Sequence, residues 1–272
     1  MRLLLGQLAP VPGEVERNLA HLEAALRSAP SDLAVFPELY LSGYRVGDRF
    51  HTLALRDGAP AVERLRSLAR STPTTIVTGA PWASPERAGE IQNVVLVVGP
   101  DGAVATQAKR YLPTFGPFEE GVPFTPTDVS RPLAVGGHPV GFEICYDLFF
   151  PEVSRQLSLG GAGLLVAISA SPVTSAALFA RLLPARAIEN GLPVVFVNRV
   201  GVEDGIVFAG GSGAWDPRGQ AIAGRAVALA GAAPEETLTL VEIDPEEAAR
   251  WRPFRPVLRD VASRPGVPGA AA

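Results

Sequence analysis

The chain has 272 residues, 47% of them hydrophobic and 19% charged, so it can bury a substantial core in one large domain or two small ones. Its formal net charge of −4, without a long lysine or arginine run, argues against a nucleic-acid partner. No apolar run approaches the roughly 20 residues that a membrane helix needs, and a single cysteine excludes an internal disulfide. We therefore expect a cytoplasmic globular protein with no membrane partner.

The first half of the chain alternates strand-like and helix-like segments. A short apolar run predicts a strand at 2–9, and leucines at helical spacing predict a helix over 14–28. The next helix carries Val62, Leu65 and Leu68. Further strands are expected at 32–38, 74–79, 91–98 and 103–108. The last two should form a hairpin, because Pro100-Asp-Gly102 between them is a good turn signal.

The second half repeats this alternation. Strands are expected at 139–144, 163–169, 193–198 and 237–243, helices at 151–159 and 174–190, and Gly-rich extended segments at 205–215 and 219–223. Pro184 should kink or divide its helix. Residues 253–272 are rich in Pro, Arg and Gly and are expected to form an arm or tail behind a domain spanning 1–252. The alternation predicts a layered α/β fold with its site at the carboxyl ends of strands.

The only cysteine, Cys145, stands between an apolar strand and a proline-opened helix in Gly141-Phe-Glu-Ile-Cys-Tyr-Asp-Leu-Phe-Phe-Pro-Glu152. Free cysteines are often plain core residues. A strand-to-helix turn, however, can present a side chain outward and aim backbone N–H groups at it. A free thiol titrates near ~8.5, so it needs a base, a cation or a helix N-terminus to react at neutral pH. The position favours a nucleophile.

Two other segments supply an acid and a cation for this thiol. Glu38 ends the apolar run Phe36-Pro37-Glu38, where partial desolvation would raise its pKa and make it a usable proton acceptor. Lys109 follows a strand in a chain where lysine is scarce, and it could stabilise a developing oxyanion. Each residue also has an explanation without a functional role: Glu38 could be a helix N-cap or a salt-bridged surface acid, and Lys109 could be a solvated lysine.

Together these three residues fit acyl transfer. Glu38 would take the thiol proton, the thiolate would attack an amide-like carbon, and Lys109 with the backbone N–H of Tyr146 would hold the oxyanion. Glu38 would then protonate the leaving amine, and water would release the thioester. The residues lie far apart in the sequence, so only the fold can bring them together.

Other chemistries fit the sequence less well. A papain-like pair would need an imidazole near Cys145, but His138 is seven residues upstream on a predicted strand, about 23 Å away. Three scattered histidines and one cysteine show no metal-ligand spacing. Gly160-Gly-Ala-Gly163 follows a helix and is better explained as a helix C-terminal turn than as a phosphate loop. Ser212 narrowly misses the nucleophile-elbow pattern of serine hydrolases.

At these residues the sequence resembles the nitrilase, or carbon–nitrogen hydrolase, superfamily. The motifs occur in the family's order over roughly 2–250. They are Phe-Pro-Glu38-Leu with Ser-Gly-Tyr44, Lys109-Arg-Tyr-Leu-Pro, Glu-Ile-Cys145-Tyr-Asp with Pro151-Glu152, Asn198-Arg-Val-Gly, and Phe208-Ala-Gly-Gly-Ser212. The resemblance implies an αββα sandwich, no metal or organic cofactor, and assembly into homo-oligomers through helical faces.

The resemblance also implies site roles. Glu38 would be the base, Lys109 the oxyanion stabiliser and Cys145 the nucleophile. A further supporting acid maps to Glu120, with Glu119 as the other possibility. For the substrate pocket we expect walls from Tyr44, Phe115, Phe118 and Tyr146, and a substrate contact from Ser171.

Within the family, the segment from Lys109 to Glu120 is similar to the glutaminase domain of glutamine-dependent NAD synthetases. That domain usually carries an acidic residue after the nucleophile, where this chain has Tyr146, and basic residues after the Ser171-Pro step, which are missing here. We therefore expect hydrolysis of a small amide with release of ammonia or amine. A glutaminase subunit serving a separate synthetase is the alternative, and a non-catalytic interaction protein is an alternative of another class.

Overall fold

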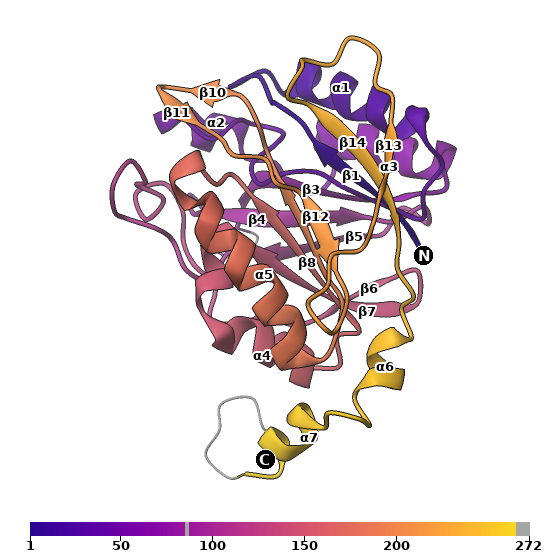
Figure 1. Cartoon of the computed structure of the whole chain (residues 1–272). Helices are drawn as coiled ribbons and strands as arrows, with labels where there is room; N and C mark the ends of the chain where they lie inside the picture. The colour runs from indigo at the N-terminus through magenta and orange to yellow at the C-terminus, as the bar shows by residue number, and fades with distance from the viewer. Residues whose placement is uncertain (85–86, 265–272) are drawn as a thin grey trace.

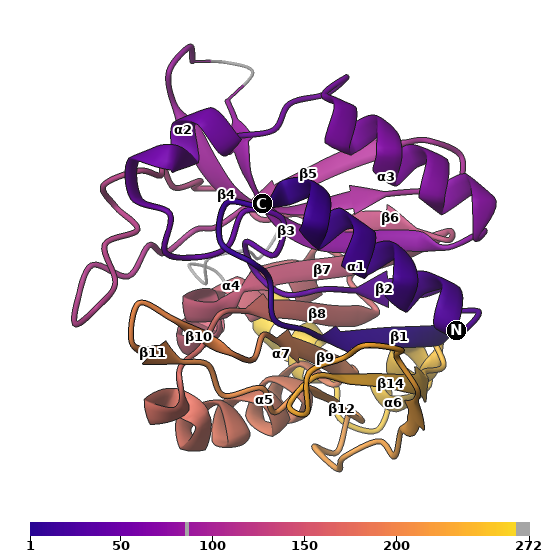
Figure 2. The same ribbon diagram turned by 90° about the horizontal axis from the view of Figure 1, so that it is seen from above.

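A computed structural model describes residues 1–84 and 87–264 of the chain. Two β-sheets pack face to face, and helices cover the outer face of each sheet, as the two orthogonal views show (Figures 1 and 2). This arrangement confirms the predicted four-layer αββα sandwich.

The first sheet has seven strands in the order β13-β14-β1-β2-β3-β4-β5. Strand β1 pairs in parallel with β2, and β2 with β3, whereas the other neighbours are antiparallel. The bounds are β1 Arg2–Gln7, β2 Leu33–Val35, β3 Thr75–Ala83, β4 Ile91–Val98, β5 Val104–Ala108, β13 Arg225–Val227 and β14 Thr237–Glu242. Gly102, at a φ of +86°, supplies the predicted turn between β4 and β5.

The second sheet has five strands in the order β12-β9-β8-β7-β6, and its three central strands are parallel. The bounds are β6 Leu133–Val135, β7 His138–Ile144, β8 Leu164–Ser169, β9 Val194–Asn198 and β12 Gly213–Trp215. A separate small hairpin joins β10 Val202–Glu203 to β11 Ile206–Val207. The parallel strands of both sheets place their carboxyl ends where the site lies.

Four longer helices form the outer layers. Helices α1 and α3 cover the first sheet, and α4 and α5 cover the second (Figure 2). Their bounds are α1 Val15–Ser28, α3 Pro60–Ser71, α4 Pro151–Leu159 and α5 Ala176–Asn190. The shorter elements are α2 Phe50–Leu53, α6 Glu247–Trp251, α7 Val257–Ala262, and the 3-10 turns η1 Gly47–Arg49, η2 Cys145–Phe149 and η3 Val173–Ser175.

Three apolar layers hold the sandwich together. Alternate residues of one strand face different layers: Leu3 and Leu5 of β1 lie between the two sheets, whereas Leu4 faces α1 and α3. Phe179 and Leu183 of α5 pack on the outer face of the second sheet. Burying such side chains contributes about 25 cal/mol per Å² of apolar surface.

Several element predictions need correction. The strand expected at 32–38 is only Leu33–Val35, because the chain turns at Pro37 and Leu39 takes a φ of +49°. Pro184 does not divide its helix, since α5 continues to Asn190 and packs on the sheet through residues on both sides of the proline, while the alternative of a kink stays a prediction. The short edge strands β6 and β13 were not predicted, because three residues carry too little periodicity.

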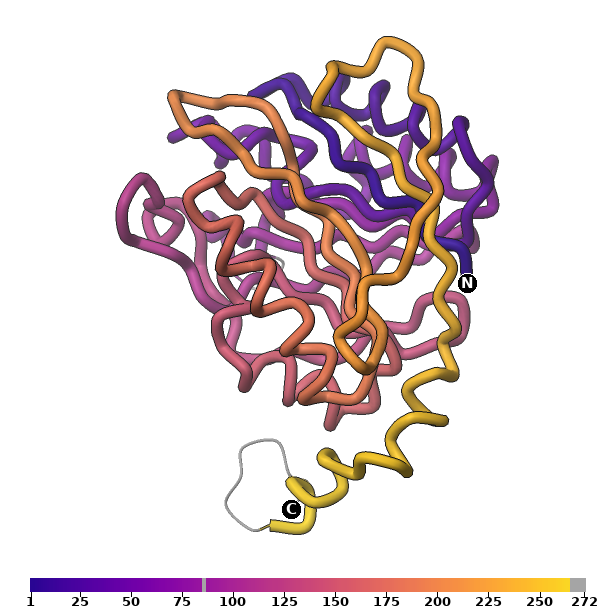
Figure 3. Tube along the Cα trace, in the orientation of Figure 1, coloured from indigo at the N-terminus to yellow at the C-terminus, as the bar shows by residue number. Residues whose placement is uncertain are grey.

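The C-terminal segment differs partly from the expected arm. The chain leaves the sandwich through α6 and α7, as the trace shows (Figure 3), and α7 contacts α4 and α5. The helix α7 was not predicted, and residues 265–272 of the expected tail lie outside the described residues. The boundary at 252 stays a prediction. Among the helices of residues 1–84 and 87–264, none is long and apolar enough to cross a membrane.

Candidate active site

The predicted acid, lysine and thiol meet at the seam between the two sheets. Glu38 follows β2 and Lys109 follows β5, so both belong to the first sheet, while Cys145 follows β7 of the second. The charges of Glu38 and Lys109 both act on the Cys145 thiol. The fold therefore brings the three groups near enough to influence one another, and their joint catalytic role stays a prediction.

The backbone around Glu38 is tightly fitted. Gly79 of β3 lies against it, and a Cβ at that position would come within 2.6 Å of Glu38 Cα and 2.2 Å of Leu39 N. The Gly79 N–H donates to Pro37 O at 2.9 Å. Only glycine allows this approach, and together with the left-handed conformation of Leu39 it turns Glu38 toward the seam.

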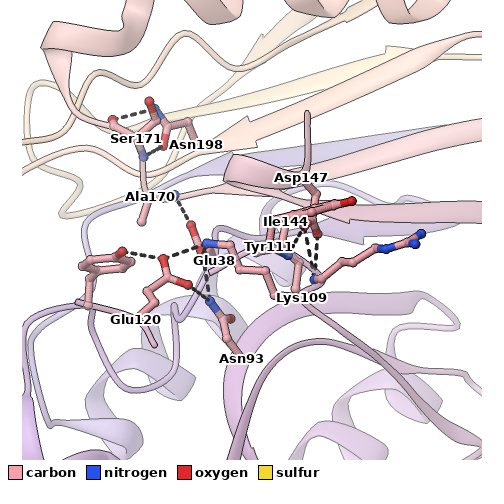
Figure 4. A network of polar contacts seen from close by, with 12 residues as sticks. Glu38, Asn93, Lys109, Tyr111, Glu120, Ile144, Asp147, Ala170, Ser171 and Asn198 are labelled. Atoms are coloured by element: carbon pink, nitrogen blue, oxygen red, sulfur yellow. Dashed lines mark hydrogen bonds and ion pairs between the residues drawn. The ribbon is translucent and has the colours of Figure 1, made fainter. Parts of the chain in front are cut away.

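Glu38, Lys109 and Glu120 form a buried charge cluster (Figure 4). Lys109 Nζ lies 2.7 Å from Glu38 Oε1 and 2.7 Å from Glu120 Oε1. Asn93 of β4 donates from Nδ2 to Glu38 Oε1 at 2.8 Å and to Glu120 Oε2 at 3.3 Å. The Ala170 N–H, just after β8, donates to Glu38 Oε2 at 2.8 Å and so links the two sheets.

The charge states follow from burial and pairing. Burial favours an uncharged amine and would lower the pKa of Lys109, but the carboxylates of Glu120 and Glu38 outweigh it and raise that pKa above its usual range. Burial raises the pKa of Glu120 to about 7; Lys109 opposes this rise and Glu38 adds to it. Lys109 is therefore a permanent ammonium, whereas Glu120 can exchange a proton near neutral pH.

The cluster distinguishes the two acids that the sequence left open. Glu120 is buried and bonded to Lys109, while Glu119 is exposed. Tyr44 donates its hydroxyl proton to Glu120 Oε1 at 2.5 Å. Burial, followed by the Glu120 charge, raises the pKa of Tyr44, so it stays a phenol. Glu120 is thus the acid that faces the lysine.

Cys145 occupies a strained turn. Its φ is +47°, an uncommon conformation for a side chain other than glycine, and it begins η2 directly after β7. The residue is half-buried. Burial, with the Glu38 charge, raises the pKa of the Cys145 thiol, while Lys109 and the Ser169 hydroxyl lower it. The net rise keeps the resting thiol protonated, so attack requires a base.

Asp147 ties this turn to the segment after Lys109. Its Oδ1 accepts the N–H of Tyr111 at 2.9 Å and of Arg110 at 3.2 Å, and its Oδ2 accepts the N–H of Ile144 at 3.2 Å (Figure 4). Burial raises the pKa of Asp147 to about 6, although Lys109 and these three donors oppose the rise. Asp147 was included in a sequence motif but was assigned no role. The available signal was an acid two residues after Cys145 in an otherwise apolar run.

The remaining predicted substrate-binding residues lie around this cluster. Phe115 is exposed, and its ring packs edge-on against Tyr146 at 5.2 Å and Phe118 at 6.0 Å. Tyr146 also contacts Phe149 and Phe150. Tyr44 is bonded inside the cluster and packs against Phe118. These rings form an aromatic wall, but their contact with substrate stays a prediction.

Ser171 is held from both sides by Asn198, a residue quoted in a motif but given no role. The Ser171 N–H donates to Asn198 Oδ1 at 2.8 Å, and Asn198 Nδ2 donates to Ser171 O at 3.1 Å (Figure 4). Asn198 Nδ2 also donates to Gly210 O at 2.9 Å. Asn198 therefore fixes the loop that carries the Ala170 N–H. Whether the buried Ser171 hydroxyl contacts substrate stays a prediction.

A second buried ion pair, not anticipated from the sequence, supports Tyr44. Arg199 pairs with Glu203, and both side chains are buried. Glu203 Oε2 accepts the N–H of Tyr44 at 2.9 Å and of Arg45 at 2.8 Å. The Arg199 guanidinium also lies 4.0 Å above the Phe208 ring. The β10–β11 hairpin is in this way joined to the loop of Tyr44.

A cavity of about 340 Å³ lies next to the charge cluster, on the side of Glu120. Tyr44 and Glu120 line it together with apolar side chains such as Phe50 and Phe124, and Cys145 is not among its lining residues. In the part of the chain that the structure describes, no group of three or more His, Cys, Asp or Glu side chains is placed to hold a metal ion.

The chain is similar to carbon–nitrogen hydrolases of known structure and sequence. The Carbon-nitrogen hydrolase family model matches residues 3–253. An (R)-stereoselective amidase from a Pseudomonas species is 32% identical over 265 residues, which cover 96% of this chain and 91% of the amidase. Glutamine-dependent NAD(+) synthetase from Thermotoga maritima is 34% identical over 258 residues, which cover 92% of this chain and 43% of the synthetase.

A solved amidase from Nesterenkonia sp. AN1 gives a TM-score of 0.77 at 29% identity, covering 93% of this chain and 97% of that one. Solved forms of that amidase carry acrylamide, or the acetamide moiety of fluoroacetamide, at its active-site cysteine.

Proposed function

Because the chain belongs to the carbon–nitrogen hydrolase family, we propose that it hydrolyses a small amide through a thioester on Cys145. The observation that carries this proposal is the buried Lys109 ammonium, held between Glu38 and Glu120 beside a half-buried thiol on a strained turn. The covalent adducts at the active-site cysteine of the Nesterenkonia amidase support the nucleophilic role of the thiol in this proposal.

In the proposed reaction the Cys145 thiol gives its proton to Glu38 while sulfur attacks the amide carbon. The Lys109 ammonium and the Tyr146 N–H stabilise the negative charge on the carbonyl oxygen. Collapse of the tetrahedral intermediate breaks the carbon–nitrogen bond, and the proton on Glu38 goes to the departing nitrogen. Water, deprotonated by Glu38, then attacks the thioester; the acid leaves and the thiol is restored.

The natural amide is proposed to carry an apolar acyl group. The wall formed by Phe115, Tyr146 and Phe149 offers apolar contact rather than partners for the charged groups of glutamine. An amide panel scored for ammonia release tests this, with glutamine as one member. Cys145→Ala should abolish release and any acyl adduct seen by mass spectrometry, because no other thiol exists in the chain. Undiminished release from Cys145→Ala would refute the assignment.

The second candidate is a glutaminase subunit that supplies ammonia to a separate synthetase. The similarity to the synthetase of Thermotoga maritima, confined to 43% of that protein, favours it. Assays with glutamine alone and then with a candidate synthetase separate the two functions. A non-catalytic role would require that no amide be cleaved and that an alkylating agent show no preference for native Cys145.

We also propose that the protein forms homo-oligomers through its helical layer. Leu178 and Ile188 of α5 are large apolar side chains that are 48% and 42% exposed in the single chain. Contact with a second copy of the chain would remove the apolar surface of these two side chains from water. Light scattering on the purified protein measures the mass directly, and a monomer at micromolar concentration would contradict the proposal.

A further inference from the structure

A second buried polar group lies directly behind the nucleophile turn, and the reaction above makes no use of it. Glu143 of β7 is fully buried, two residues before Cys145, and its side chain faces α4. Ser154 Oγ lies 2.6 Å from Glu143 Oε1, while Glu143 Oε2 has no hydrogen-bond partner among residues 1–84 and 87–264. A buried carboxylate oxygen without a partner is costly when it carries charge.

Arg186 of α5 reaches the same turn from the other side. Its Nε and Nη2 donate to Leu148 O at 3.0 and 2.8 Å, so two donors of one guanidinium hold a carbonyl of η2. Its Nη1 donates to Glu189 at 2.9 Å. The positive charge of Arg186 also lies near enough to Glu143 to lower the pKa of that carboxyl, although burial outweighs it.

We propose that the two hydrogen bonds from the Arg186 guanidinium to Leu148 O brace the Cys145 turn from behind, and that ionisation of Glu143 draws Arg186 away and slows the nucleophile. A Glu143 carboxylate with an open oxygen competes with Leu148 O for the donors of Arg186. Loss of those bonds frees η2, and the strained φ of Cys145 then relaxes. The inference rests on the proposed function in taking Cys145 as the nucleophile.

The groups around Glu143 place this ionisation in an accessible range. Burial raises the pKa of Glu143 to about 8; Ser154 and Arg186 oppose the rise, whereas Asp147 and Glu189 add to it. The brace from Arg186 to Leu148 O is therefore intact at pH 7, and above pH 8 most of Glu143 is ionised and competes for Arg186. Glu143 is a positioning residue here, since it acts on Cys145 only through the turn.

The single cysteine gives a readout that does not depend on the substrate. The alkylation rate of Cys145 by iodoacetamide, followed by mass spectrometry, is compared between Glu143→Gln and the wild-type protein from pH 6.5 to 9.5. Glutamine keeps a partner for Ser154 and cannot ionise. We expect a rate ratio near one at pH 7 that rises to about tenfold by pH 9, as nine-tenths of Glu143 ionises. A ratio that stays flat across this range overturns the proposal.

Two further variants keep the test decisive. Glu247→Gln removes another carboxyl whose pKa burial raises, but on α6, and should leave the profile unchanged. If Glu143→Gln does not fold, Ser154→Ala removes the hydrogen bond that lowers the pKa of Glu143, so the alkaline decline should move to higher pH. A decline that stays at its wild-type pH contradicts the brace. If the wild-type protein released no ammonia from any amide but still showed the expected pH dependence of Cys145 alkylation, only the proposed function would be contradicted.

Discussion

At the scale of single residues, Lys109 is the only lysine of the chain, and it is withdrawn from water between two carboxylates. An ammonium buried in this way depends on its partners, because removing one leaves charge that is poorly compensated. Asn93 bonds to both carboxylates and so fixes the distance between them. The geometry of the cluster is therefore set before any substrate arrives.

Removing the Glu120 charge should weaken catalysis without removing the nucleophile. Glu120→Gln loses a charge-assisted bond to Lys109, of a kind that contributes about 1.5–3 kcal/mol, so we expect kcat/KM to fall by about 10- to 100-fold. The initial rate of ammonia release measures this. Glu119→Gln is the matched control, because Glu119 is exposed and adjacent, and it should stay within about twofold. Equal losses in both variants would contradict the role of Glu120.

At the scale of elements, η2 and the segment after β5 are joined by the hydrogen bonds of Asp147 and by the ring contact between Phe115 and Tyr146. Its carboxylate accepts three N–H donors, and these hydrogen bonds are strongest while both oxygens are unprotonated acceptors. The position of Lys109 relative to Cys145 thus depends in part on this buried anion.

The loss of activity below pH 6 should reflect protonation of Asp147, after an earlier loss near pH 7 from protonation of Glu120. Burial raises the pKa of Asp147 to about 6, so protonation below that pH weakens the three bonds and lowers kcat. Stability should move the other way: because the folded pKa lies above the unfolded one, the Asp147 contribution to folding becomes more favourable as pH falls from about 6 toward 4. Activity and urea-unfolding profiles of wild type and Asp147→Asn measure both. Parallel acid losses of activity and stability would contradict this account.

The sequence predicted the long elements, the three residues of the candidate site and the nearby acid Glu120, but not the other groups that hold them. Periodic leucines identified α1, and ordered motifs identified Glu38, Lys109 and Cys145. Asn93, by contrast, stands inside an apolar strand, and its partners lie 55 and 27 residues away in sequence. Spacing along a chain carries no information on such contacts. The short strands β6 and β13 were not predicted for a related reason. They are strands because they pair with β7 and β14, and this pairing cannot be seen in three residues of sequence.

At the scale of the whole molecule, the site lies where two sheets dock, so packing between the sheets should matter to it more than packing beneath the helices. Adjacent residues of β1 separate these layers: Leu3 faces the other sheet, and Leu4 faces α1 and α3. Both side chains are fully buried.

Leu3→Ala and Leu4→Ala should therefore cost similar stability with different effects on activity. Each deletion removes a buried leucine and should lower the free energy of unfolding by about 2–5 kcal/mol. Leu3→Ala loosens the sheet interface and should also slow ammonia release well below the melting temperature, whereas Leu4→Ala should not. Urea unfolding and rate assays at one temperature provide both values. Equal rates in the two variants would show that the interface does not govern the site.

The bond from the Ala170 amide to Glu38 has one more implication. The proposed base and the proposed nucleophile are contributed by different sheets, so neither half of the sandwich holds the full set of groups that the proposed reaction needs. A partly assembled molecule would thus be inert toward amides, even with all its helices formed. The time at which amide hydrolysis recovers during refolding would therefore measure when the two sheets dock.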